Sequence, residues 1–311
     1  MHKFAMVALV VAVMAGCKGG SGSDDGNNGN GGNDGNGGVT TVASEAGTRT
    51  ELSNLANANS SAHVSTDQSF PRPYESAIAV NNEYECYSTF CSLDGNPVSD
   101  ATLWRHELGD EVPLIPVYFA IEGEGEGVKD QRALDALKIV TDAIYPEGNG
   151  KVFEDKGFIR FAEGTLTSTS IIDYSDAANR GKGGLIISLG TSQPYYDVSK
   201  QSRTIMCGSV TSHPLTMGTA RQIIDTRGAV HSDKGWTWLN LGNEETNCGF
   251  DTGIAAHELA HYLYLGGKHF HGFGEGNTET FGDPAKALLH TIYRNPLEST
   301  VDSMEYTWND R

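Results

Sequence analysis

The spacing of hydrophobic positions between residues 112 and 265 predicts a domain with both strands and helices. From 130 to 145 the apolar residues recur every three or four positions and stop before Pro146, which is typical of an amphipathic helix. The segment 220–226 is a further helix candidate. Short runs of apolar, β-branched or aromatic residues predict strands instead. The predicted strands cover 112–121, 158–161, 185–189 and 236–241.

Two of these strands also carry information about their place in a sheet. Proline cannot donate a backbone hydrogen bond, so Pro113 and Pro116 limit the 112–121 strand to a sheet edge or to the start of a strand. The 185–189 run is almost entirely apolar, as expected of a strand buried on both faces. Together with the helices, the order of elements predicts an α+β fold with a mixed sheet.

A third helix is predicted at 253–265, where an apolar segment ends at Gly266-Gly267. Residues four positions apart lie on one face of a helix, so His257 and His261 can reach a single metal ion. Glu258 lies about 100° further round the helix and can reach a water bound to that ion. The spacing therefore predicts a catalytic zinc site with this glutamate as the general base.

The first residues form a targeting segment rather than part of the fold. An apolar run from 4 to 15 is too short to span a bilayer but is typical of a secretory signal. The sequence Met14-Ala15-Gly16-Cys17 resembles the cleavage box of bacterial lipoproteins, which implies a lipid on Cys17. An ordinary signal peptide with an incidental cysteine is the alternative. Lys18 is not the aspartate that favours the inner membrane in such signals, so an outer-membrane anchor is favoured.

Composition divides the rest of the chain after the signal at 1–17 into three parts. Residues 18–68 are rich in Gly, Asn, Asp, Ser and Thr and are expected to form a disordered tether, with at most a weak helix at 51–57. Residues 69–111 form either an N-terminal extension packed on the main domain or a removable pro-segment. Residues 112–311 form the zinc peptidase domain.

The cysteines fit an exported protein, because disulfides persist in oxidising compartments. If Cys17 carries lipid, four cysteines remain, and four allow three pairings. The simplest arrangement joins Cys86 to Cys91 in a local loop and Cys207 to Cys248 across the domain.

Beyond the helix, the sequence resembles the metzincin family of zinc peptidases over about residues 112–306. That family continues His-Glu-x-x-His with x-x-Gly-x-x-His and has a later turn that contains Met-x-Tyr, which Met304-Glu305-Tyr306 matches. Residues 180–190 and Cys248 are similar to the corresponding stretches of the astacin branch. The resemblance implies a twisted mixed sheet over the active-site helix. It also implies that Met304 is a hydrophobic floor under the ligands and that Tyr306 is an oxyanion donor.

The third zinc ligand is where the chain departs from the family pattern. The family's glycine and third histidine would fall on Tyr264 and Gly267. Two residues later the chain restores the Gly-x-x-His ending, so the resemblance favours His269 as the third ligand. His271 is the close competitor. A second zinc-peptidase pattern uses a glutamate, for which Glu279 and, less well, Glu275 are the candidates.

The remaining histidines have no spacing that pairs them with another ligand, and we expect them to be ordinary surface or core residues. They are His106, His213, His231 and His290.

Together these features predict a secreted, membrane-anchored zinc endopeptidase that holds Zn²⁺ and acts on protein or peptide substrates. The net charge of −18 argues against nucleic acid as a partner and against electrostatic binding to anionic lipid. The resemblance implies that the substrate adds to a sheet edge, with the 236–241 strand as its neighbour. Two other functions stay open: an inactive lipoprotein adhesin or binding module on a peptidase-like fold, and a hydrolase of cell-wall peptides.

Overall fold

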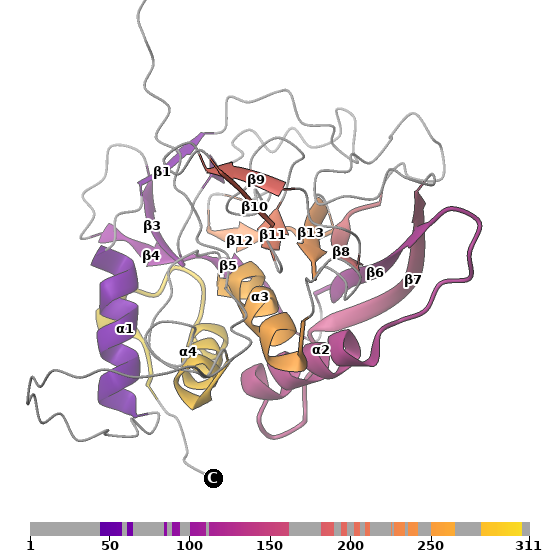
Figure 1. Ribbon diagram of the computed structural model, residues 1–311. Coiled ribbons are helices and arrows are strands. Elements are labelled where there is room, and N and C mark those ends of the chain that lie inside the picture. Colours follow the sequence, from indigo (N-terminus) through magenta and orange to yellow (C-terminus); the bar gives the residue numbers. More distant parts are fainter. Residues whose placement is uncertain are drawn as a thin grey trace, which may run out of the picture.

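The computed structural model has a mixed α+β fold, which confirms the predicted fold class at this level (Figure 1). Among the residues that it describes, no helix is long and apolar enough to cross a membrane. The described residues are 44–57, 61–64, 84–85, 89–93, 100–109, 112–161, 182–189, 194–197, 202–205, 209–211, 225, 227–233, 236–241, 250–264 and 281–306.

The centre of the fold is a five-stranded sheet made of β6 (Ile115–Glu122), β7 (Phe153–Phe161), β8 (Gly184–Ser188), β11 (Ser209–Thr211) and β13 (Trp236–Asn240). The strand order is β11-β13-β8-β6-β7. Four strands run parallel, and β11, at one edge, is antiparallel to β13. Parallel neighbours need a crossover connection, and α2 (Gln131–Ile144) lies in the one between β6 and β7.

The predicted elements of this domain are found close to where the sequence places them. The helix predicted at 130–145 is α2, and its N-cap is Asp130, whose side chain accepts a hydrogen bond from the backbone N–H of Arg132 at 2.8 Å. The strand predicted at 158–161 is the end of β7, which begins earlier, at Phe153. The helix candidate at 220–226 lies outside the described residues except for Asp225.

The structure bears on two expectations about the sheet edges. β6 lies between β7 and β8, so Pro116 does not mark an edge. Pro116 is the second residue of β6, and pairing with β8 begins only at Val117, so the start-of-strand alternative is the one that holds. β13 lies between β11 and β8, and its two edges are therefore already paired. A substrate cannot pair with it unless β11 is displaced.

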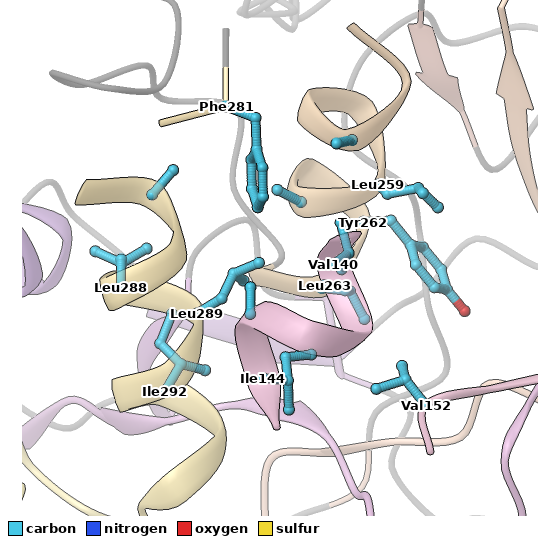
Figure 2. Packing of buried hydrophobic residues seen from close by; sticks show 14 of the residues in the cluster. Val140, Ile144, Val152, Leu259, Tyr262, Leu263, Phe281, Leu288, Leu289 and Ile292 are labelled. Carbon is cyan, nitrogen blue, oxygen red and sulfur yellow. The ribbon is translucent and has the colours of Figure 1, made fainter. Parts of the chain in front are cut away.

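One face of the sheet packs against helices and forms the main core. Ile115, Val117 and Phe119 alternate along β6 and belong to this core, whereas Tyr118 belongs to a separate cluster with Ile186. Much of the rest of this core comes from three helices: α2, α3 (Thr252–Tyr264) and α4 (Asp283–Arg294). Figure 2 shows side chains of these three helices packed against one another in the core.

The N-terminal extension adds short strands to the fold. Its strands β2 (Tyr84–Glu85), β3 (Phe90–Leu93) and β4 (Thr102–Leu103) form a small sheet with β1 (Ser61–Val64), which precedes the extension. In the main domain, β9 (Pro194–Asp197) pairs with β10 (Ser202–Ile205). β5 (Arg105–His106) pairs with β12 (Ala229–Val230) of the main domain. The backbone N–H of Leu103 also donates to the carbonyl of Ser299 at 2.8 Å. These bonds fix residues 102–106 to the main domain.

The cysteine predictions fall largely outside the described residues. Cys91 is buried and disulfide-bonded. The other four cysteines, Cys17, Cys86, Cys207 and Cys248, lie outside the described residues, so their pairing and the lipid stay predictions.

Residues 18–68 were predicted to be a disordered tether with at most a weak helix at 51–57. The structure differs at two places: residues 45–57 form α1 (Glu45–Asn57), and residues 61–64 form β1. Leu52 and Leu55 are buried and, with the partly buried Ala56, join the main core. These three residues lie on one face of the helix, next to α4. Ser44 caps the helix start, because its hydroxyl accepts from the backbone N–H of Gly47 at 3.0 Å. The polar composition around this short apolar face suggested disorder.

Replacing Leu52 by alanine should therefore destabilise the whole domain. Leu52 is fully buried, and removing such a side chain lowers the free energy of unfolding by about 2–5 kcal/mol. Urea unfolding followed by tryptophan fluorescence measures the change. Asn54→Ala, at an exposed position of the same helix, is the matched control. Equal unfolding midpoints for the two variants would show that α1 does not contribute to the core.

Candidate metal site on helix α3

Helix α3 carries the predicted ligands and lies inside the core. Its start is fixed by Asp251, whose side chain accepts a hydrogen bond from the backbone N–H of Ile254 at 2.7 Å. The side chains of residues 255–263 are all buried, so the polar ones among them have little access to water. The helix predicted at 253–265 is confirmed, with a shift of one residue at each end.

The two histidines of α3 converge on one point. Their Nε2 atoms lie 3.0 Å apart, and the ring centroids are 4.6 Å apart with the rings at 83° to each other. His257 is fully buried and His261 is 9% exposed. Two nitrogens bound to tetrahedral zinc at about 2.0–2.1 Å are separated by about 3.3 Å, so this spacing fits two ligands of one ion. A shared hydrogen bond between the rings is compatible with the same distance.

Glu258 lies between the histidines in the sequence and is itself buried, with 5% of its surface exposed. Burial raises the pKa of its carboxyl group to about 8, because the charged form loses its hydration. Among the described residues, no cation opposes this effect. A divalent ion near this carboxyl group would favour the ionised form. The donors on α3 therefore suit a cation electrostatically as well as geometrically.

The candidates for the third ligand all lie outside the described residues. They are His269, His271, Glu279 and Glu275. Within the part of the chain that the structure describes, no group of three or more His, Cys, Asp or Glu side chains is placed to hold a metal ion. The choice among these candidates stays a prediction.

The Met304 turn packs into the same core as α3. Met304 is 5% exposed and follows η3 (Val301–Ser303). The Tyr306 hydroxyl donates to the carbonyl of Val301 at 2.7 Å, and the Arg49 guanidinium lies 4.0 Å above its ring centroid. The described contacts thus join Tyr306 to its own turn and to α1. The floor role of Met304 and the oxyanion role of Tyr306 stay predictions.

The structure brings one more histidine to α3. His106, in β5, is fully buried, and its ring lies against that of Tyr262 with the centroids 4.5 Å apart. Its Nε2 lies 3.3 Å from the Tyr262 carbonyl oxygen, and its Nδ1 lies 2.6 Å from the Ser232 hydroxyl oxygen. A carbonyl only accepts, so Nε2 carries the proton and Nδ1 accepts from the serine. Sequence spacing gave no signal for this contact, because the partners are far apart along the chain.

The surroundings of His106 keep its ring neutral. Burial lowers the pKa of His106 to about 3, the nearby Arg105 charge acts in the same direction, and the bond to Tyr262 partly opposes them. The expectation of an ordinary core residue holds for the burial of His106, but the residue also bonds to helix α3.

Comparisons of the chain with protein-family models, with curated proteins and with solved structures find no match.

The lowered pKa of His106 predicts a specific loss of stability in acid. The unfolded chain takes up a proton at His106 near pH 6.5, whereas the folded chain does so only near 3. Between these values the unfolded state binds more protons, so stability falls as pH falls, by up to about 1.4 kcal/mol per pH unit. His106→Gln lacks this contribution and should show a shallower dependence. Urea unfolding of both proteins from about pH 7 to about pH 4 measures it, and identical slopes would contradict the prediction.

Proposed function

We propose that the protein is a zinc endopeptidase in which His257 and His261 bind the metal and Glu258 is the general base. The observation that carries the proposal is the approach of two imidazole nitrogens to 3.0 Å inside the core, next to a buried glutamate in the sequence. Burying the Glu258 carboxylate in an apolar environment is unfavourable unless a positive charge compensates it. A zinc ion bound by the two imidazole nitrogens would supply that charge.

A metzincin-like architecture is part of this proposal. The sequence resemblance implies a mixed sheet, an active-site helix packed on it and a buried methionine turn. The described sheet, helix α3 and Met304 agree with those three features and support the proposal. His269 is the proposed third ligand, with His271 and Glu279 as the alternatives.

Zinc at this site would polarise the scissile carbonyl and lower the pKa of a water molecule to about 7. Glu258 then accepts the proton of the attacking water and passes it to the leaving amine. For this it must be ionised at neutral pH, although burial alone raises the pKa of its carboxyl group to about 8. The positive charge of a bound zinc ion would lower the pKa of this carboxyl group again. Because α3 carries the base and both ligands, their relative positions are set by one rigid element.

Tyr306 is the proposed donor to the oxyanion that forms from the substrate carbonyl. Its hydroxyl already donates to the Val301 carbonyl at 2.7 Å. Assisting the reaction requires that it exchange this acceptor for the substrate oxygen. An oxygen that carries negative charge is a stronger acceptor than a backbone carbonyl, so the exchange becomes favourable as the charge develops.

The proposed place for an extended substrate is the edge strand β11. It is the outermost described strand on its side of the sheet, and it lies next to α3 as well as β13. A peptide paired to β11 would gain main-chain hydrogen bonds whatever its side chains are. This proposal replaces the expected pairing with residues 236–241.

The proposed location is the bacterial cell envelope, with a lipid on Cys17 as the membrane anchor and the outer membrane favoured. The apolar signal and the small residues before Cys17 support this.

Glu258→Gln tests the role of the base. The amide keeps the size of the side chain but cannot accept a proton, so zinc content should be retained while kcat/KM falls by about 10²–10⁴. Zinc is measured by atomic absorption and turnover with a fluorogenic peptide library. Glu124→Gln, at an exposed position, is the control and should keep full activity.

Three outcomes separate the proposed enzyme from the other functions. A wild-type protein that holds zinc and cleaves no peptide would favour the binding module. Cleavage of purified cell-wall peptides alone would favour the wall hydrolase. Full turnover by Glu258→Gln would rule out this glutamate as the base.

The ligand set is tested by metal content. His257→Ala and His261→Ala should each lose zinc, because each removes one of the converging nitrogens. Among His269→Ala, His271→Ala and Glu279→Ala, only the variant that removes the third ligand should lose it as well. Dialysis against a chelator of known affinity gives the binding constants. Zinc binding that survives both α3 variants would disprove the site.

A further inference from the structure

The last turn of α3 depends on side chains from other elements. The final four carbonyls of a helix have no partner within it. Two of those in α3 receive hydrogen bonds across the fold: His106 Nε2 lies 3.3 Å from the Tyr262 oxygen, and the Tyr293 hydroxyl donates to the Leu263 oxygen at 2.8 Å. Both carbonyls directly follow the ligand His261 in the sequence. The orientation of the second ligand is therefore coupled to β5 and to α4.

Arg105, the neighbour of His106, makes the equivalent contact at the end of α4. Its guanidinium donates to the carbonyl of Asn295, the C-cap residue of that helix, at 2.9 Å and to the carbonyl of His106 at 2.7 Å. It also lies 5.2 Å from the ring centroid of Tyr293. Arg105 is 7% exposed, and its Nε has no hydrogen-bond partner among the described residues. The negative end of a helix stabilises a cation placed there, which explains how this charge is tolerated.

Asn295 extends the connection to the methionine turn. Its side-chain amide donates to the carbonyl of Glu305 at 3.0 Å, and its side-chain oxygen accepts from the Glu305 backbone N–H at 2.8 Å. Glu305 directly follows Met304. His106 thus bonds to α3, and Arg105 is connected through Asn295 to the turn that contains Met304.

We infer that Arg105 and His106 are positioning residues of the zinc site, holding the His261 turn of α3 and the Met304 turn in place from the N-terminal extension. This inference rests on the proposed function. Neither side chain is assigned contact with metal or substrate; both act by capping helix ends. It follows that residues 100–106 remain in the mature domain and are required for the geometry of the site. Removing them as a pro-segment would loosen the site rather than activate it.

The molecule offers a matched control for the cap on α3. His290 Nδ1 lies 3.1 Å from the carbonyl oxygen of Ile144, the last residue of α2. His290, which belongs to α4, therefore also contacts the C-terminal end of another helix, and that helix, α2, carries no proposed ligand. A general effect of losing a histidine cap should appear at both positions, whereas a positioning effect should appear only at His106.

The test compares His106→Phe, His106→Gln and His290→Phe in the purified protein, with zinc affinity measured by chelator competition. Phenylalanine keeps the ring contact with Tyr262 but removes the donor, and glutamine restores an N–H donor. Zinc binding by folded His106→Phe should be about tenfold weaker, the scale of losing a residue that orients a ligand. His106→Gln should recover it, and His290→Phe should match the wild type. Tyr293→Phe, which loses only a hydroxyl, should lower the affinity in the same direction and serves if His106→Phe does not fold.

Amide hydrogen exchange of the metal-free protein provides a second readout. Faster exchange in the last turn of α3 is expected for His106→Phe and not for His290→Phe. Wild-type zinc affinity in folded His106→Phe, or equal losses in both Phe variants, would overturn the inference and leave the proposed function intact. If the wild type binds no zinc, the proposed function fails, and the exchange rates alone decide whether His106 holds the end of the helix.

Discussion

The central constraint on this fold is the burial of a helix that carries polar side chains. Residues 255–263 of α3 are all buried. Leu259 and Leu263 belong to the core that α3 shares with α2, α4 and the sheet, and each such side chain contributes about 2 kcal/mol by leaving water. The same burial removes hydration from His257, Glu258 and His261. A desolvated carboxylate costs several kcal/mol, so these residues need compensation within the protein.

The buried polar groups of α3 differ in how far the described residues compensate for their lost hydration. The imidazoles of His257 and His261 turn toward each other, so one proton or one cation serves both. Glu258 gains nothing comparable from the described residues, and burial raises the pKa of its carboxyl group. The helix itself is satisfied at its end by His106 and Tyr293, which come from distant parts of the chain. The stability of α3 and the geometry of His257 and His261 are therefore connected.

The N-terminal part of the chain is more closely tied to the rest than its composition suggests. α1 contributes Leu52 and Leu55 to the main core, and Arg49 covers the ring of Tyr306 in the methionine turn. β5 supplies the two residues that cap α3 and α4. Neither segment is strongly apolar, because each presents only a few side chains to surfaces that the main domain already forms. Segments of this kind are easily taken for linkers.

The sequence by itself determined the helix at α3, the spacing of His257 and His261 on one face, and the position of most strands of the central sheet. These are local properties, since a helical or extended backbone fixes which neighbours share a face. Only the tertiary structure decided that Pro116 lies in a central strand, that β11 is the edge, that α1 packs into the core and that His106 bonds to Tyr262. Those contacts join residues far apart along the chain, and no periodicity within a segment encodes them, because they depend on the path of the backbone between the segments.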